Sequence, residues 1–560
     1  MQITPQARLE AYKSKGWWGE QTIDDLLRAA VAQSGDQLAL VDPLNREALL
    51  GDEPKRLTFA QVDRSVDAMA RAFLAAGVGR DDIVLTQLPN VVEGVLALLA
   101  CSRIGAILSP VAMAFRKHEL TSVIKQLNPS LVLTVREFHG CDHALQMKEL
   151  RDQGVYDGPV ICLGRGDPFS SLEEAQSAAG HVTLSDPRLH SGEVATICWT
   201  SGTEADPKGV PRHHAHWVFN GECMVEAAML EEGDRILNPF PLINIAAFGG
   251  MVIPWLLCRG CLVQHHPFDL AVFLQQFEAE RVNYTVAPPA ILTMLLKKPE
   301  MLEGIDFSKV KCIASGSAPL PPFMVKAWQE QYGVAIMNVF GSNEGCSLIS
   351  TPVVVDDPEM RAALFPRFGA SGLDWAMSFP ARMKTRLVDL HTEDEIVAPG
   401  QSGELRIDGA MVFDGYWNNS ELTAQAFDDQ GFFKTGDLFE IAEEEDGRFY
   451  RFVGRCKEII IRGGVNISPA ELDSLIESHP AVREAACAAY PDERLGERVC
   501  AVVVTQPGEE IDLEALVEYL KTKDISVYKL PEKLTVVPVL PRNPLGKVLR
   551  RHLSEIASRD

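Results

Sequence analysis

Basic residues are scarce relative to acidic ones in this 560-residue sequence. It has 53 Lys and Arg residues against 77 Asp and Glu residues, which gives a formal net charge of −24. An acidic surface repels phosphate backbones and anionic lipid headgroups, so the composition disfavours a nucleic-acid-binding function and we expect no nucleic-acid partner. Any anionic ligand must be held locally, by loops, helix N-termini or a bound cation.

The sequence also lacks a long, uninterrupted apolar segment. Its longest apolar stretch, Val91 to Phe115, contains Glu93, Arg103 and Pro110, which a transmembrane helix would not normally carry. The first residues, MQITPQARLEAYKSKGWWGE, contain no apolar core of a secretion signal. We therefore expect a cytoplasmic protein without an integral membrane segment.

Zinc-binding spacings are absent as well. The 12 cysteines are scattered, and the one close pair, Cys258 and Cys261, has no second pair or nearby histidine at zinc spacing. Its apolar surroundings favour buried or free thiols over a redox role. Two groups of histidines are not at helical ligand spacing, so we expect packing or surface roles for them: His213, His214 and His216, and His265 and His266. We expect no transition metal bound by protein ligands.

Apolar strands alternate with longer amphipathic helices along most of the chain. The segments DDIVLTQL (81–88) and KVKCIASG (309–316) are typical of strands, and each is followed by a helical pattern, at 91–105 and 321–332. This order is that of βαβ units with parallel sheets. No fixed-period repeat is present, and the length exceeds that of one compact domain. We predict an α/β fold with more than one domain.

The pattern changes in the last third of the sequence. From about Gly403, short strands with glycine turns predict a small β-rich subdomain at about 380–455, with a hairpin at Asp446-Gly447. After Gly454-Arg455, three strand patterns and two helical patterns are followed by a basic stretch. We predict a large N-terminal domain over 1–455 and a small C-terminal α+β domain over 456–560.

Residues 196–210, TICWTSGTEADPKGV, have the composition of a phosphate-binding loop. Small residues let backbone N–H groups approach phosphate oxygens, hydroxyls add donors, and Lys208 adds positive charge near a leaving pyrophosphate. The segment does not match the Walker pattern, so an ordinary Ser/Gly turn after a strand is the alternative. The candidate phosphate ligands are Thr200, Ser201, Gly202, Thr203 and Lys208.

This loop resembles the TSGTTGxPKG signature of the adenylate-forming superfamily, which includes acyl-CoA synthetases, luciferases and peptide-synthetase adenylation domains. The resemblance continues along nearly the whole chain, in the family's order. The matching segments are Gly105 to Pro110, Ser315 to Leu320, Asn338 to Glu344, Gly403-Glu404, Gly415 to Trp417, Thr435 to Asp437, Gly454-Arg455, Gly463-Gly464 and Pro541 to Arg551. It implies a large AMP-binding domain followed by a mobile small domain.

The resemblance implies roles for the matching residues. Glu344 would hold Mg²⁺, a hard cation that prefers carboxylate oxygens. Phe340 would pack against adenine, and Asp437 and Arg455 would bind the ribose hydroxyls. For Glu344 and Phe340 the alternatives are a solvated surface carboxylate and ordinary core packing. The remaining ATP- or AMP-binding positions are Gly316, Ser317, Ala318, Asn338, Gly341 and Asn343.

Further matches lie near the C-terminus. Lys547 would be catalytic, because an ammonium that bridges the substrate carboxylate and the α-phosphate neutralises charge in the transition state; a solvated basic helix end is the alternative. Lys457 matches the family's hinge. The Gly463-Gly464 loop would let the pantetheine arm of coenzyme A reach the acyl carbon.

Four positions depart from the common family pattern. Glu204-Ala205 replaces Thr-Gly in the phosphate loop, Asn343 stands where threonine is usual, Asn244 where many relatives have histidine, and Lys434 where arginine is frequent. These departures concern rate and substrate choice more than the type of reaction.

The resemblance also locates an acyl pocket, which is apolar and has no basic residue placed to neutralise a second charge. It favours an uncharged aliphatic, alicyclic or aromatic acid, and the segments Lys15 to Gly19 and Val41 to Arg46 resemble those of bacterial ligases for alicyclic and related acids. The pocket residues are Trp217, Phe219, Asn244, Ala246, Phe248 and Ala314.

We expect a carboxylic acid:CoA ligase that uses ATP, Mg²⁺ and coenzyme A. The alternatives are an adenylation enzyme that loads a carrier protein and a non-catalytic nucleotide-binding relative. Retention of the candidate functional residues argues against the latter: Lys208, Glu344, Asp437, Arg455 and Lys547. A homodimer is left open.

Overall fold

The structure is a computed structural model that describes residues 1–200, 207–345, 347–456, 458–462, 465–492, 494–523, 525, 527–542 and 548–558. Its internal contacts divide the chain into two compact units. The first unit comprises Met1–Ala362, Ser371–Lys384 and Asp408–Phe433, and the second comprises Ala363–Ala370, Thr385–Ile407 and Lys434–Asp560. The predicted domain boundary near Arg455 falls inside the second unit and stays a prediction.

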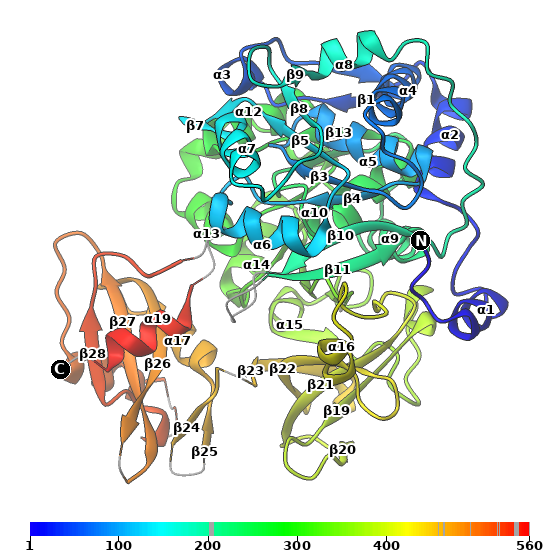
Figure 1. Cartoon of the computed structure of the whole chain (residues 1–560). Coiled ribbons are helices and arrows are strands. Elements are labelled where there is room, and N and C mark those ends of the chain that lie inside the picture. The colour runs from blue at the N-terminus through cyan, green and yellow to red at the C-terminus, as the bar shows by residue number, and fades with distance from the viewer. Residues whose placement is uncertain are drawn as a thin grey trace. The chain divides into compact units, whose positions relative to one another are not determined.

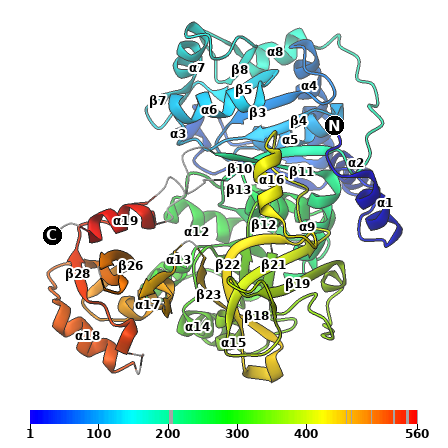
Figure 2. The same ribbon diagram turned by 60° about the horizontal axis from the view of Figure 1, so that its bottom comes forward.

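A seven-stranded sheet in the first unit carries the predicted phosphate loop at one edge. All its strands pair in parallel except the edge strand β11, which pairs antiparallel with β10. Helices α6 (Lys117–Leu127) and α7 (His143–Asp152) pack beside it (Figure 2). The strand order is β11 (Lys208–His213), β10 (Val194–Thr200), β4 (Ile107–Pro110), β3 (Ile83–Gln87), β5 (Leu131–Val135), β8 (Val160–Leu163) and β9 (Ser170–Ser171).

An eight-stranded sheet in the same unit carries the predicted adenine-binding segments. The six inner strands pair in parallel with one another, whereas each of the two edge strands, β2 and β17, pairs antiparallel with its neighbour. One core is formed with α12 (Leu270–Ala279), α13 (Pro289–Lys297) and α14 (Pro322–Tyr332). The strand order is β17 (Ser347–Ser350), β16 (Ile336–Gly341), β15 (Cys312–Gly316), β14 (Tyr284–Val286), β12 (Arg235–Asn238), β13 (Cys261–Gln264), β1 (Leu38–Val41) and β2 (Arg56–Thr58).

A layer of helices contacts both sheets, through α4 on β1 and α5 on β4 (Figure 1). Its members pack against one another: α2 (Ile23–Ser34), α4 (Phe59–Ala75), α5 (Val92–Ile104), α9 (His214–Ala227) and α11 (Ile253–Cys258). The predicted strand–helix successions are thus β3–α5 and β15–α14. Shorter elements of the first unit are α1 (Gln6–Ser14), α3 (Arg46–Leu50), β6 (Glu137–Phe138), β7 (Cys141–Asp142), α8 (Leu172–Ala178), α10 (Ile245–Ala247), a π-helical turn (Phe248–Val252) and α16 (Ser420–Ala426).

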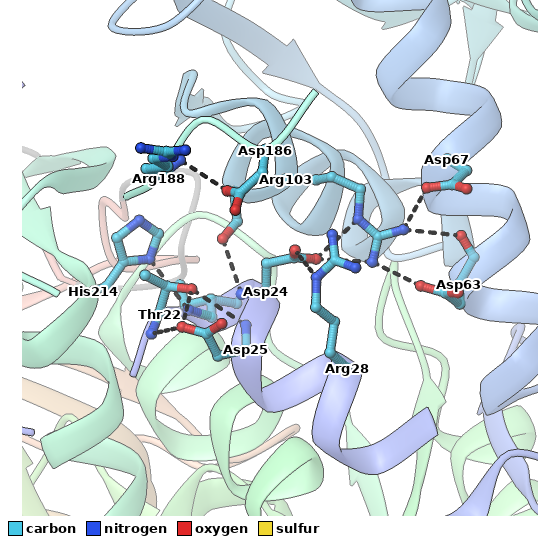
Figure 3. A network of polar contacts seen from close by, with 12 residues as sticks. Thr22, Asp24, Asp25, Arg28, Asp63, Asp67, Arg103, Asp186, Arg188 and His214 are labelled. Carbon is cyan, nitrogen blue, oxygen red and sulfur yellow. Dashed lines mark hydrogen bonds and ion pairs between the residues drawn. The ribbon is translucent and has the colours of Figure 1, made fainter. Parts of the chain in front are cut away.

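Arg103 joins three helices of this layer by ion pairs, which Figure 3 shows. Its guanidinium contacts Asp24 of α2 at 2.8 Å and, on α4, Asp63 at 2.7 Å and Asp67 at 2.6 Å. The Arg103 side chain is only 3% exposed, whereas Arg28, which also contacts Asp24, is 60% exposed. The charge of the buried Arg103 guanidinium is therefore balanced by carboxylates. Its ion pairs link helices α2, α4 and α5.

We expect Arg103→Met to lower the free energy of unfolding by about 2 kcal/mol, because it leaves carboxylates near the protein interior without their shared partner. Arg28→Met should cost less than about 1 kcal/mol, since its ion pair faces solvent. Chemical denaturation followed by circular dichroism measures both, and equal losses would contradict the assignment.

The second unit contains two sheets. The six-stranded sheet includes the predicted hairpin, β22 and β23, whose connection contains a 3-10 turn at Glu444–Gly447 with positive φ at Glu445, Asp446 and Gly447. Its strand order is β18 (Leu364–Pro366), β23 (Phe449–Arg455), β22 (Phe433–Ile441), β21 (Ser402–Gly409), β19 (Met383–Val388) and β20 (Glu395–Ile396). The short helix α15 (Pro358–Ala363) precedes β18.

The five-stranded sheet has helices on both faces (Figure 1). Helices α17 (Pro469–Glu477) and α18 (Leu513–Lys521) share one core with it, and α19 (Arg550–Ala557) shares another. Its strands are β25 (Val465–Ile467), β24 (Ile460–Arg462), β27 (Gly496–Thr505), β26 (Val482–Asp492) and β28 (Lys533–Val536). The predicted α/β class is confirmed. In the described part of the chain, no helix has both the length and the apolar character needed to cross a membrane.

Candidate nucleotide-binding site

The described ends of the predicted phosphate loop lie on two paired strands, β10 and β11. Thr200, the last residue of β10, pairs with Lys208, the first residue of β11. The Lys208 ammonium lies 5.8 Å from the centre of the Tyr416 ring, and the backbone N–H of Trp417 donates to the carbonyl of Gly209 at 2.9 Å. The 415–417 motif therefore lies against the loop's second strand. Ser201, Gly202, Thr203, Glu204 and Ala205 lie outside the described residues.

Glu344, the predicted magnesium ligand, is a buried carboxylate, 8% exposed, a few residues after β16 ends. The Tyr416 hydroxyl donates to its Oε1 at 3.0 Å, and the backbone N–H of Phe413 donates to its carbonyl at 2.9 Å. Burial, together with the Glu344 charge, raises the pKa of Tyr416 well above its usual range, so the hydroxyl stays protonated and able to donate. Sequence reasoning matched Tyr416 to the family but gave it no role.

Gly345 follows Glu344 and needs to be glycine. Its φ is +97°, in the left-handed region, and a Cβ atom would collide with the carbonyl oxygen of Met411 and with Arg212. The loop that carries Glu344 thus packs tightly against the chain near residue 411.

Asn343 bridges two parts of the site. Its side-chain nitrogen donates to the Trp199 carbonyl at 3.2 Å, and its side-chain oxygen accepts from the Ile245 N–H at 2.9 Å. Asn244, the other asparagine at a departure position, accepts from the Ala247 N–H at 3.2 Å and begins α10. The two asparagines that depart from the family pattern therefore accept hydrogen bonds from the segment that follows Pro241.

Arg212 is a buried cation that sequence reasoning missed. It donates to the carbonyl of Asn343 at 3.1 Å and to the side chain of Asn220, and its guanidinium lies 5.0 Å from the Trp217 ring centre. Burial lowers its pKa to about 10. The local sequence, KGVPRH, contains several polar residues and offered no signal that would single out Arg212. Its bonds support the loop that carries Glu344.

The predicted adenine-binding residues meet at the carboxyl ends of β15 and β16. In the register of these parallel strands Gly316 pairs with Val339, and a Cβ on Gly316 would collide with the Val339 carbonyl. Ser317 has φ +68°, and Ser317, Ala318 and Gly341 are exposed, while Phe340 is half-buried. Ligands of open α/β sheets bind at such strand ends. Asn338 is buried and donates to the Ala362 carbonyl at 2.7 Å.

Asp437 and Arg455 lie opposite each other in the second unit. They are register partners on β22 and β23, and the Arg455 Nε is 3.3 Å from Asp437 Oδ1. Asp437 is buried, whereas the Arg455 side chain is 41% exposed. The acceptor and donor predicted for the ribose are thus brought together. The predicted residues Lys457, Gly463, Gly464 and Lys547 lie outside the described residues.

The predicted acyl-pocket residues divide between two sides of α9. Trp217 contacts the buried Phe248 ring, with centroids 5.6 Å apart, whereas Phe219 lies beneath the Arg382 guanidinium at 5.2 Å. Two positions along a helix are about 200° apart, so these side chains face different directions. Ala314 is buried in β15, and Ala246 is half-buried in α10.

Among the described residues, one cluster could bring three metal-binding atoms together: His213, His216 and Asp414, within 4.8 Å of one another. Each histidine Nδ1 accepts the other's backbone N–H, at 3.1 and 3.4 Å, so the proton of each neutral ring is on Nε2, the nitrogen nearest Asp414. The ring centroids are 3.4 Å apart, and the two Nε2 atoms lie 3.9 and 4.0 Å from the same oxygen, Asp414 Oδ2. The bonds to the two Nδ1 atoms cap the start of α9, and the expectation of no bound transition metal stays a prediction.

The 11 described cysteines are free, as the sequence indicated for the whole set, and nine of them are buried. Cys258 ends α11 and Cys261 begins β13, and burial raises the pKa of both thiols to about 12. Protonated, buried thiols are poor nucleophiles. The pair belongs to the core of the first unit.

Parallel sheets with binding residues at their carboxyl ends, a Ser/Thr/Gly/Lys loop and a buried carboxylate together define a nucleotide-binding α/β enzyme. The sequence matches the family model described as AMP-binding enzyme over residues 27–417, and that of the AMP-binding enzyme C-terminal domain over residues 471–547. The chain belongs to this family of AMP-binding enzymes, the predicted adenylate-forming superfamily.

Several known proteins are similar over almost their whole length. The chain is 29% identical to the medium-chain fatty-acid–CoA ligase of Escherichia coli K12 (97% of this chain and 92% of the relative covered) and 30% identical to the indoleacetate–CoA ligase of Aromatoleum aromaticum (90% and 94%). It is 28% identical to a salicyl-AMP ligase / salicyl-S-ArCP synthetase of Mycobacterium tuberculosis (98% and 93%). The crystal structure of ATP-bound MatB from Rhodopseudomonas palustris matches with a TM-score of 0.79 at 26% identity, over 96% of this chain and 99% of that one. The predicted enzyme class, an AMP-forming ligase, is confirmed.

Proposed function

We propose that this enzyme is an ATP-dependent carboxylic acid:CoA ligase. It activates an uncharged aliphatic, alicyclic or aromatic acid as an acyl adenylate with release of pyrophosphate, and then transfers the acyl group to the thiol of coenzyme A. The observation that carries the proposal is the grouping of Lys208, Tyr416 and Glu344, with the cation near the tyrosine ring and the tyrosine bound to the carboxylate.

The Glu344 carboxylate suits a magnesium ion that is shared with ATP. Tyr416 occupies Oε1, while Oε2 has no hydrogen-bond donor among the residues that the structure describes. A hard divalent cation prefers such an oxygen and completes its shell with waters and substrate phosphates. Bound there, the ion would neutralise charge on the β- and γ-phosphates.

The remaining residues divide the work of the first half-reaction. Lys208 attracts the pyrophosphate as it leaves, and Gly316, Ser317, Ala318 and Phe340 line the adenine base. Asp437 accepts a hydrogen bond from the ribose diol and Arg455 donates one. Lys547 stabilises the charge that develops as the substrate carboxylate attacks the α-phosphate.

The contact of Trp217 with Phe248, together with Ala314, supports an acid without a second charge. Arg212 is the basic residue beside Trp217, and two of its nitrogens bond to Asn220 and Asn343. Its bond to the Asn343 carbonyl supports the loop that carries Glu344.

A second candidate function is the loading of a carrier protein. The salicyl-AMP ligase / salicyl-S-ArCP synthetase is about as similar to this chain as the CoA ligases are. A screen of AMP release with aliphatic, alicyclic and aromatic acids, run with coenzyme A or with a phosphopantetheinylated carrier protein as acceptor, separates the two. Turnover with the carrier protein alone would overturn the CoA assignment.

We expect Glu344→Gln to raise the Mg²⁺ concentration needed for half-maximal adenylate formation by about 50-fold, because the amide is a weaker ligand for a hard cation. ATP–pyrophosphate exchange across a magnesium titration measures this. Glu226→Gln, which alters an exposed contact to Ser378, is the control and should leave the titration unchanged. An unchanged titration for Glu344→Gln would contradict its role.

A further inference from the structure

The N-terminal segment Thr4–Trp18 is bound along a stretch of chain some 400 residues away. Four of its side chains donate to successive groups of Asp408–Asp414. Tyr12 donates to Asp408 at 2.9 Å, Trp18 to the Ala410 carbonyl at 2.8 Å, Arg8 to the Val412 carbonyl at 3.2 Å and Thr4 to Asp414 at 2.6 Å. Arg8 also forms an ion pair with Asp414 at 3.1 Å. In each of these contacts the hydrogen-bond donor or the cation comes from the N-terminal segment.

Asp414 shows that these bonds are needed for the arrangement. Its side chain is only 3% exposed, and burial raises its pKa while Arg8 and Thr4 oppose that change. Removing the cationic partner of a buried carboxylate strongly destabilises the folded protein. The N-terminal segment therefore fixes the path of residues 408–414.

The same stretch of chain contacts the loop that carries Glu344. Met411 packs against Gly345, Phe413 donates its N–H to the Glu344 carbonyl, and Tyr416 donates its hydroxyl to the Glu344 carboxylate. One short segment is thus bound on one side by the N-terminal residues and on the other by the predicted magnesium ligand.

We propose that Thr4–Trp18 is a positioning element of the nucleotide site, which acts through Asp408–Tyr416 to hold the Glu344 carboxylate in one orientation before magnesium and ATP bind. The proposal rests on the proposed function, since it concerns the metal that Glu344 would hold. Groups that orient a metal ligand are typically worth 10- to 100-fold in metal affinity. Preorganisation lowers the cost of ordering on binding.

Two variants test the two ends of this path. Tyr416→Phe removes the hydroxyl that bonds Glu344, and Arg8→Met removes the cation at Asp414 while retaining much of its length. We expect each to weaken binding of MgATP about tenfold and to leave binding of AMP unchanged, because AMP has no β- and γ-phosphates to share the metal. Isothermal titration calorimetry with MgATP and with AMP measures both constants without turnover.

The controls remove similar groups elsewhere. Tyr156→Phe deletes a hydroxyl that donates to the Pro159 carbonyl, and Arg28→Met deletes an exposed partner of Asp24. Both should bind MgATP and AMP as the unmodified protein does. Thermal melting checks the fold, and if Arg8→Met does not fold, Tyr12→Phe, which removes only the hydroxyl that donates to Asp408, takes its place.

Equal weakening of MgATP and AMP binding by Tyr416→Phe and by the N-terminal variant would mean general damage and overturn the proposal, as would unchanged MgATP binding. If the unmodified protein bound ATP equally well with and without magnesium, the metal role in the proposed function would fail. That result is distinguishable, because it appears before any variant is made.

Discussion

Lys547→Ala is expected to lower adenylate formation by at least about 10²-fold, the typical loss of one preorganised donor to a transition state. Two anions, the attacking carboxylate and the α-phosphate, approach each other in this step, and the proposed ammonium neutralises both. The second half-reaction replaces AMP by a thiol and does not need this contact. Conversion of a presynthesised acyl adenylate to thioester should therefore continue in the variant.

Lys521→Ala is the matched control for this experiment. Lys521 lies at the end of α18, is 51% exposed and contacts Glu518 at 2.6 Å, so its loss should leave both half-reactions unchanged. Measuring exchange and thioester formation separately in both variants tests the assignment. If Lys547→Ala slowed both half-reactions equally while its circular dichroism stayed native, the catalytic role would be wrong.

The fold was predictable where burial produces a regular pattern. Continuous apolar runs gave the buried strands β3 and β15, and glycine or proline marked the ends of α5 and α14. Gly105, at φ +77°, ends α5, and Pro322 begins α14, as local backbone chemistry dictates. Such features depend on residues that are neighbours in the sequence, so a single sequence is enough to predict them.

The units of the fold were not predictable in the same way. Residues 408–433 belong with the first unit although they lie within the stretch, about 380–455, that was predicted as a single β-rich subdomain. The reason lies in contacts such as that of Phe413 with Glu344 and of Arg8 with Asp414, between positions far apart in the chain. A local sequence pattern does not predict which distant segment of the chain will pack against a given carboxylate.

For the candidate site, motif matching found residues that touch the nucleotide in the proposed function but not those that hold them. Glu344 stood out in a motif, whereas Arg212 beneath its loop lies in an ordinary strand. Tyr416 was visible as part of a matched segment, yet its bond to Glu344 depends on the three-dimensional path of residues 411–416. The supporting residues are determined by packing, which a single sequence does not reveal.

Gly464→Leu is expected to reduce thioester formation by on the order of 10²-fold while acid-dependent ATP–pyrophosphate exchange continues. Gly464 stands in the sequence between β24 and β25, and the resemblance to the family places the pantetheine arm beside it. A bulky side chain there would obstruct the thiol. ATP and the acid would be unaffected, because most of their proposed ligands lie in the first unit.

The competing explanation is a turn glycine that is needed only for its backbone conformation. Gly464→Ala separates the two, because it imposes the same backbone restriction with little bulk. A channel predicts a loss that increases from alanine to leucine and is confined to the thioester step. Gly508→Leu is the matched control: that glycine has φ +83°, and no atom lies within 4 Å of the position that a Cβ would take there, so strain should lower the melting temperature without a selective loss of thioester. Equal losses for Gly464→Ala and Gly464→Leu, or loss of exchange together with thioester, would favour the turn and refute the channel.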